Sequence, residues 1–173
     1  QALILSEYRK LVFENHKISI KPVVLLKSKT ISESKSFYNG FHDKLRILSP
    51  TDIEDIRITN SSNEIFANAF KFFDEIKLTN DELVDLIKID FSESKCVNMN
   101  ELNPENEKIV NNLDEKDNQH RLIFIVDKLT EGWDVLSLFD IVRLYETRQG
   151  GPKGTVSKYT ISEAQLIGRG ARY

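Results

Sequence analysis

The run Leu122-Ile-Phe-Ile-Val126 is the clearest continuous apolar stretch of the chain, and the run Asp140-Ile-Val-Arg-Leu-Tyr145 follows it closely. A third run, Val23-Val-Leu-Leu26, begins directly after Pro22. Short apolar runs are typical of strands that are buried on both faces, as in parallel sheets. The three runs therefore predict a mainly parallel sheet that is flanked by helices.

Helical patterns lie between these runs. Apolar residues recur at helical spacing in residues 2–15, and Ser32 is placed to cap a second helix. Asn103-Pro104 suits the first turn of a third helix, because proline is tolerated there. A brief strand is expected at residues 96–99. Strands that alternate with helices favour an α/β fold with three layers and crossover helices.

Residues 49–95 have a character of their own. The segment from Ile65 to Ile76 carries apolar residues on one helical face. Thr79-Asn-Asp-Glu82 has the sequence of a capping box, in which a threonine and a glutamate three residues apart open a helix. We expect two helices joined by a short turn, with an acidic outer face. We interpret 49–95 as a helical insertion in the α/β domain.

Composition and charge restrict the function. The chain has 173 residues, of which 40% are apolar and 29% charged, as in one globular domain. Residues 1–48 contain nine Lys and Arg against four Asp and Glu, whereas residues 52–117 contain seven against 17. A uniform basic surface is therefore absent, which argues against a stand-alone nucleic-acid binder. This distribution of charge is compatible with a domain that forms one lobe of a larger cleft.

Cysteine and histidine usage excludes other classes of site. Cys96 is the one cysteine, so no internal disulfide can form and a reducing, cytoplasmic setting is expected. The three histidines lie far apart, and no metal site is expected. The apolar runs are too short to cross a membrane.

The tail Gln165-Leu-Ile-Gly-Arg-Gly-Ala-Arg172 carries the strongest candidate for chemistry. On a helix, spacings of four and three residues place Gln165, Arg169 and Arg172 on one face. Gly168 allows another backbone or a ligand to approach closely. Two guanidinium groups can clamp phosphate oxygens, since each donates in a planar fork. The alternative is an exposed basic helix end, whose arginines complement the helix dipole.

A second candidate segment, Leu129-Thr-Glu-Gly-Trp-Asp134, follows the run that ends at Val126. Gly132 permits an unusual turn, and Asp134 can accept a hydrogen bond from a ribose hydroxyl or orient an arginine. Trp133 is as well explained by a place in the core as by a stacking role.

In this order, the two segments resemble motifs V and VI of superfamily-two helicases. They are most similar to the Res subunits of type III restriction-modification enzymes, in which Lys21-Pro-Val-Val-Leu-Leu-Lys-Ser28 resembles the motif IV strand. The resemblance implies that residues 1–173 form the second, C-terminal RecA-like lobe of an ATP-dependent DNA translocase or helicase. It does not extend to residues 49–95.

The resemblance also implies roles for single residues. Arg169 and Arg172 would contact the γ-phosphate of ATP as arginine fingers, with Gln165 beside them. The nucleotide side would be completed by Gly132, Asp134 and Gly168. The nucleic-acid side would comprise Ser28, Lys29, Lys128 and Thr130.

Two parts of a complete ATPase are missing from the sequence. It has no Gly-x-x-x-x-Gly-Lys-Ser/Thr phosphate loop and no acidic magnesium box after an apolar strand. We therefore expect ATP and Mg²⁺ to be held mainly by a first RecA-like lobe of the same polypeptide, and the chain alone to be inactive. The resemblance further implies double-stranded DNA and a methylation/specificity subunit as partners, no membrane, and an endonuclease elsewhere in the full protein.

Two alternatives remain. The chain could be the second lobe of a repair or RNA helicase that has no link to restriction. It could also be a non-catalytic module whose acidic hairpin, residues 60–90, docks a partner subunit.

Overall fold

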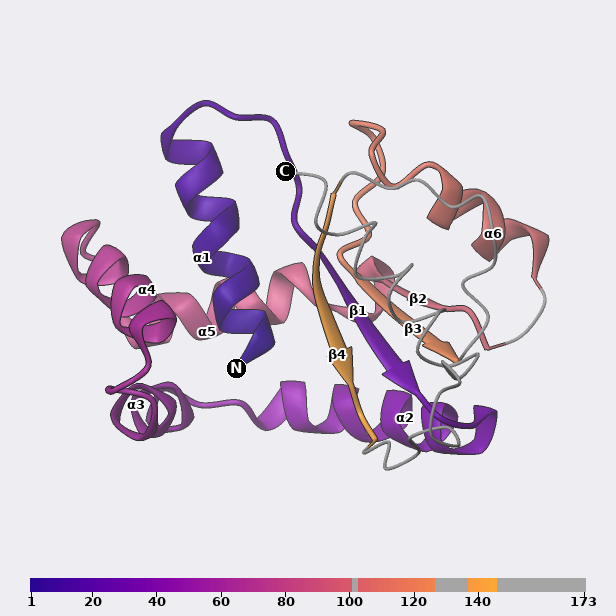
Figure 1. The fold of residues 1–173 in the computed structure, drawn as a ribbon, viewed down its shortest axis with the longest axis horizontal. Helices are drawn as coiled ribbons and strands as arrows, with labels where there is room; N and C mark the ends of the chain where they lie inside the picture. Colours follow the sequence, from indigo (N-terminus) through magenta and orange to yellow (C-terminus); the bar gives the residue numbers. More distant parts are fainter. Residues whose placement is uncertain (101–102, 127–136, 146–173) are drawn as a thin grey trace, which may run out of the picture.

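The computed structural model describes residues 1–100, 103–126 and 137–145. Helices and strands alternate over most of this part (Figure 1). The strands are β1 (Val23–Ser28), β2 (Cys96–Asn98), β3 (Leu122–Val126) and β4 (Leu138–Arg143). The helices are α1 (Ala2–Asn15), α2 (Ile31–Ile47), α3 (Pro50–Thr59), α4 (Glu64–Glu75), α5 (Asn80–Asp90) and α6 (Pro104–Asn111), with a short 3-10 helix at Glu93–Lys95.

The four described strands form one parallel sheet in the order β2-β3-β1-β4. β1 lies in the interior, with Leu25 opposite Ile123 of β3 on one side and Ile141 of β4 on the other. Parallel neighbours need long crossover connections, which α2–α5 and α6 supply. The predicted α/β fold, a RecA-like arrangement with a mainly parallel sheet flanked by helices, is confirmed.

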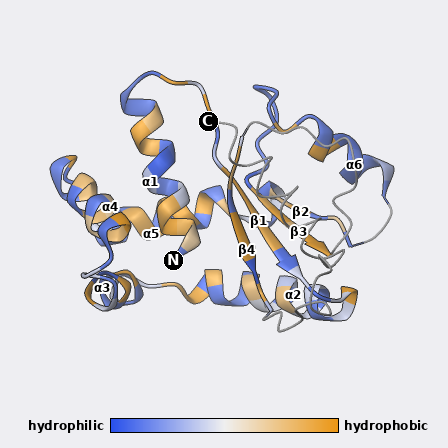
Figure 2. Ribbon diagram, in the orientation of Figure 1, coloured by the Kyte–Doolittle hydropathy of each residue, from blue (hydrophilic) through white to orange (hydrophobic). Residues whose placement is uncertain are grey.

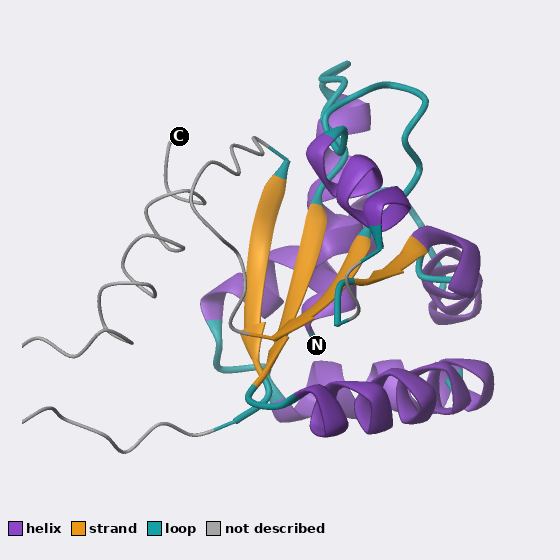
Figure 3. Ribbon diagram, turned by 90° about the vertical axis from the view of Figure 1, so that its right-hand side faces the viewer, coloured by secondary structure: helices purple, strands orange, loops and turns teal. Residues whose placement is uncertain are grey.

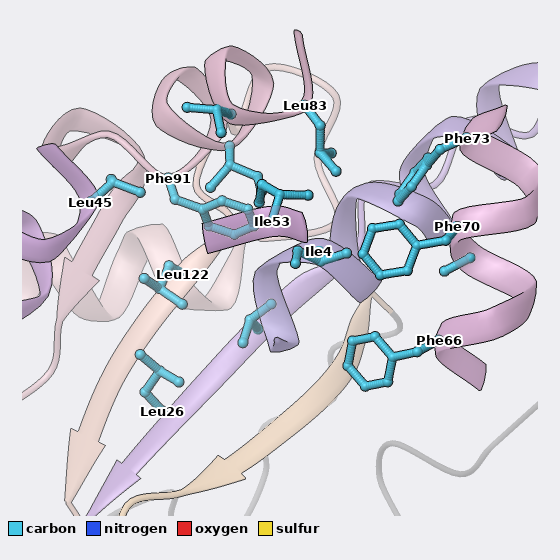
Figure 4. Packing of buried hydrophobic residues seen from close by; sticks show 14 of the residues in the cluster. Ile4, Leu26, Leu45, Ile53, Phe66, Phe70, Phe73, Leu83, Phe91 and Leu122 are labelled. Atoms are coloured by element: carbon cyan, nitrogen blue, oxygen red, sulfur yellow. The ribbon is translucent and has the colours of Figure 1, made fainter. Parts of the chain in front are cut away.

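The central strands bury alternate side chains on opposite faces of the sheet. Val24 and Leu26 belong to one apolar cluster, with α1, α2 and the helices α3–α5 packed over it. Figure 4 shows Leu26 and Leu122 of the sheet near Ile4 of α1. Val23 and Leu25 belong to a second cluster on the opposite face, which includes Val110 of α6. Burial on both faces explains why these strands read as continuous apolar runs, which are visible in the hydropathy colouring of Figure 2.

The start of α2 differs from the predicted one. Thr30, rather than Ser32, caps the helix: its side chain accepts from the backbone N–H of Glu33, whose carboxylate accepts from the N–H of Thr30. This reciprocal arrangement satisfies two donors at the helix start, which Ser32 cannot do because it lies inside the first turn. The predicted cap at Ser32 is therefore wrong by two residues.

Within 49–95 the structure contains α3 in addition to the two expected helices. Ser49 and Asp52 form its capping box, and Pro50 occupies the first helical turn. The capping box predicted at Thr79–Glu82 is present at the start of α5. The apolar face expected from Ile65 to Ile76 is narrower than predicted: its buried members are Phe66, Ala69, Phe70 and Phe73 of α4. Ile65 and Ile76 are exposed, so their place on this face was predicted wrongly. Figure 4 shows the three phenylalanines of this face.

Buried charges attach α1 to the sheet. The charge cluster consists of Glu7 and Lys10 of α1, Asp90 of α5, Lys95 and Arg121. Arg121 as a whole residue is 2% exposed. Its guanidinium group donates to Glu7 and, at 2.6 Å, to Asp90. Residues far apart in the sequence thereby meet under one helix.

Asp90 is the common acceptor of this cluster. Lys10 contacts it at 2.5 Å and Lys95 at 2.9 Å, in addition to Arg121. Burial raises the pKa of Asp90, but these hydrogen bonds and the charge of Arg121 outweigh burial and hold the pKa well below its ordinary value. Asp90 is thus ionised in the folded chain throughout the neutral range.

Removal of Arg121 tests the contribution of this cluster. We expect Arg121→Ala to lower the free energy of unfolding by about 3–5 kcal/mol, since it leaves Glu7 and Asp90 buried with less compensation. Urea unfolding followed by circular dichroism measures the change.

Arg57→Ala is the matched control. Arg57 pairs with Asp74 at 2.6 Å, but both side chains are more than a third exposed. A loss of at most about 1 kcal/mol is expected there. Equal losses of unfolding free energy in the two variants would show that the buried cluster stabilises the fold no more than an exposed ion pair does.

Candidate functional site at the carboxyl edge of the sheet

The carboxyl ends of the four described strands lie at one edge of the sheet, because the strands run parallel. The strands end at Ser28, Asn98, Val126 and Arg143. Helix α2 begins just after β1 and runs below the arrowheads in Figures 1 and 3. Ligands of open parallel sheets bind beyond this edge. This edge is therefore the expected place for a ligand.

Most of the predicted site residues lie outside the described part of the chain. They are Gln165, Gly168, Arg169 and Arg172 in the tail, and Lys128, Thr130, Gly132 and Asp134 after β3. β3 ends at Val126, directly before the second of these segments. Their roles stay predictions from the sequence.

Ser28 and Lys29 are described, and they differ in exposure. Ser28 is the last residue of β1, pairs with Val126 of β3, and is 2% exposed. Lys29 follows it in the turn to α2 and is exposed. The Lys29 ammonium group is therefore accessible to a polyanion in solvent, whereas the Ser28 side chain is enclosed by the fold.

The N-terminus of α2 is already occupied by a carboxylate. Helix N-termini attract anions through their free N–H groups and the helix dipole. Here Glu33 accepts from the N–H of Thr30 at 3.1 Å, and Thr30 in turn accepts from the N–H of Glu33. An approaching phosphate meets this negative charge, so the charge of Lys29 is the better candidate for its recognition.

Amide side chains at the end of β2 form a group that the sequence prediction missed. Asn100 donates through Nδ2 to the Ser34 hydroxyl at 2.6 Å and to Asn98 Oδ1 at 2.5 Å. Asn106 of α6 donates to the backbone carbonyl of Asn98 at 2.8 Å. The three closely spaced asparagines, Asn98, Asn100 and Asn103, were a sequence signal for side chain–backbone hydrogen bonding at a strand end.

Aromatic packing holds α2 against the sheet at this edge. Phe124 of β3 lies with its ring 4.9 Å from that of Tyr38 and 5.4 Å from that of Phe41. Such edge-on pairs add to the stabilisation from burial. This contact holds the middle of α2 against the sheet.

A hollow of about 490 Å³ lies at the opposite, amino edge of the sheet. Lys21 and Asn118 line it, and the Lys21 ammonium donates to the Asn118 carbonyl. Burial, followed by the charge of Arg121, lowers the pKa of Lys21 to about 8, against the opposing charge of Asp114. Three lysines and three acidic residues line the hollow in total, so it has no net charge with which to attract a polyanion.

Metal and thiol chemistry have little support in the described residues. No group of three or more His, Cys, Asp and Glu side chains there could hold a metal ion. Burial raises the pKa of the Cys96 thiol to about 12, which keeps it protonated at neutral pH. In the same part of the chain, no helix has the length and apolar content that crossing a membrane requires.

The sequence is similar to that of a protein from Haemophilus influenzae, the probable type III restriction-modification enzyme HindVIP Res subunit. The two are 36% identical over 171 residues, which cover 87% of this chain and 33% of that protein. The chain thus spans about a third of the length of this relative. No family model matches the chain, and no solved structure matches it. This chain is therefore a relative of the Res subunits of type III restriction-modification enzymes, and its parallel sheet fits a RecA-like lobe.

Proposed function

We propose that this chain is the second RecA-like lobe of an ATP-dependent DNA translocase or helicase, in the Res subunit of a type III restriction enzyme. The observation that carries the proposal is the similarity to a Res subunit together with the two helicase-like segments, 129–134 and 165–172. The parallel sheet supports it, since β3 leads directly into the first of these segments. The endonuclease belongs elsewhere in the full protein.

In this proposal the lobe acts on ATP that is held mainly by another lobe. Arg169 and Arg172 would donate to the γ-phosphate oxygens and stabilise the charge that develops during phosphoryl transfer. Gln165 would orient the attacking water or a phosphate oxygen. Gly132, Asp134 and Gly168 would form the part of the cleft that senses the nucleotide. Mg²⁺ would be held mainly by the other lobe, because this sequence has no acidic magnesium box after an apolar strand.

The carboxyl edge would face double-stranded DNA. Lys29 is exposed there and can neutralise a backbone phosphate. Lys128 and Thr130, which come after β3 in the sequence, would add contacts to the DNA backbone. Ser28 would support the turn from within, since it is buried. The other subunit of such an enzyme, which carries methylation and site specificity, is the expected protein partner.

Two other functions are distinguished by simple observations. A repair or RNA helicase lobe would share the ATP chemistry but would operate without a methylation subunit. A docking module would use the acidic helices α4 and α5, and its arginine variants would keep full motor activity. The similarity to a Res subunit favours the restriction enzyme.

Loss of either finger arginine tests the ATP role. In the full-length protein, we expect Arg169→Ala and Arg172→Ala each to lower DNA-stimulated ATP turnover by about 10³-fold or more, the range known for arginine fingers. Phosphate release measures turnover. Arg57→Ala, at an ion pair with Asp74, should keep normal turnover. Near-normal rates in both finger variants would refute the assignment.

The 173-residue chain alone should not hydrolyse ATP. Its sequence has no phosphate loop to position the nucleotide, and arginine fingers only complete a site that other groups build. The measurement is phosphate release from ATP with magnesium and DNA present. Steady magnesium-dependent hydrolysis, absent in the Arg169→Ala chain, would mean that the domain carries its own nucleotide site.

Lys29→Ala should weaken DNA binding through charge alone. Each phosphate contact contributes about one unit to the slope of log affinity against log salt concentration, so we expect this slope to fall by about one unit. Fluorescence anisotropy of labelled duplex DNA at several salt concentrations measures it for the full-length protein.

Lys71→Ala is the control for this change. Lys71 is an exposed lysine of α4 that lies 3.8 Å from Glu75. Its loss should leave the slope unchanged. Equal effects of the two variants would exclude a specific place for Lys29 on the DNA.

A further inference from the structure

The amide bridge, defined as Ser34, Asn98 and Asn100, connects two loops at the carboxyl edge. Ser34 lies in the first turn of α2 and is 0% exposed. Asn100 follows β2 and donates through the same Nδ2 atom to Ser34 at 2.6 Å and to Asn98 at 2.5 Å. The backbone N–H of Asn100 also donates to Asn98 Oδ1 at 3.1 Å. The chain after β2 is thereby tied to the start of α2.

The bridge reaches the turn that carries Lys29. The N–H of Ser34 donates to the Thr30 carbonyl at 3.0 Å, so Ser34 belongs to the same first turn that Thr30 caps. Lys29 directly precedes Thr30. On the other side, Asn106 of α6 holds the Asn98 carbonyl at 2.8 Å. A continuous hydrogen-bonded path thus connects α6, the end of β2 and the β1–α2 turn.

The chemistry of the bridge suits an edge that meets phosphates. The buried contacts of α1 use ionised side chains, with Arg121 and Asp90 2.6 Å apart. The bridge uses neutral amides and a hydroxyl instead. Neutral groups hold the loops together without adding to the negative charge that Glu33 already places at this edge. A carboxylate at Asn100 could accept from the Ser34 hydroxyl, but it could not donate to Asn98 Oδ1, so only the amide serves both contacts.

We propose that Ser34 and Asn100 are positioning residues for nucleic-acid binding, which fix the β1–α2 turn so that Lys29 reaches the DNA backbone. This inference rests on the proposed function. Neither residue is assigned to the reacting groups of ATP. Without the bridge, Lys29 keeps its charge, but its turn can adopt other conformations. Binding to DNA must then order the turn, which lowers the net binding free energy.

The test uses the full-length protein with Asn100→Ala, Asn100→Asp and Ser34→Ala. DNA-stimulated ATP turnover is measured against duplex concentration at low and moderate salt. The control is Asn112→Ala, which removes a comparable amide hydrogen bond to the Lys108 carbonyl at the end of α6. Thermal unfolding of every variant accompanies the kinetics.

We expect the two bridge alanine variants to raise the half-saturating DNA concentration about threefold to tenfold, the effect of one or two hydrogen bonds. Maximal turnover should stay within about twofold of the unmodified protein. Asn100→Asp should be worse than Asn100→Ala for two reasons: its carboxylate faces the acceptor Asn98 Oδ1, and it adds negative charge beside the DNA. The second effect should be largest at low salt. Asn112→Ala should leave DNA saturation unchanged.

Three outcomes would overturn the inference. Unchanged DNA saturation in the bridge variants would show that the bridge does not position the DNA-binding turn. An Asn100→Asp variant as good as or better than Asn100→Ala would place the bridge away from phosphates. A loss that follows a lowered unfolding temperature would make the role structural. If the unmodified protein shows no DNA-stimulated ATP turnover, the proposed function itself fails, and this inference fails with it.

Discussion

The position of β1 between two parallel neighbours is the constraint from which most of the structure follows. A strand with parallel partners on both sides must have its own side chains covered above and below, because crossover helices lie on both faces. Because all the described strands run parallel, their carboxyl ends also lie at the same edge of the sheet. The turn after Ser28, Asn100 after β2 and the end of β3 at Val126 therefore lie at one border of the sheet.

Local signals in the sequence were sufficient for the sheet and most helices. Leu122–Val126 and Val23–Leu26 were recognisable because full burial leaves no polar alternation, and Thr79–Glu82 because a capping box is a local pattern. The cap of α2 was misplaced because Thr30 and Ser32 are both good caps. The reciprocal contact with Glu33, three residues after Thr30, decides between them. Helix α3 has the same type of start at Ser49, and its apolar face is too short to stand out.

Long-range contacts could not be predicted in this way. Arg121 meets Glu7 and Asp90 only because the fold brings α1, α5 and the start of β3 together. The amide bridge likewise joins Asn100 to Ser34 across the connection from α2 to β2. At the candidate site the sequence pointed to Lys29 through resemblance, but not to the partners that hold its turn. Sequence patterns specify which residues can form hydrogen bonds, and the topology decides which of them meet.

The charge cluster under α1 has a mechanical consequence. Salt bridges and hydrogen bonds depend on direction, so a helix held by several of them tolerates little rotation or sliding, whereas one held by apolar contacts alone can shift more easily. Arg9 adds a further contact, to Asp140 of β4, at 2.5 Å. A force applied to α1 would therefore be distributed among α5, β3 and β4. The helix and the sheet would move together as one rigid unit.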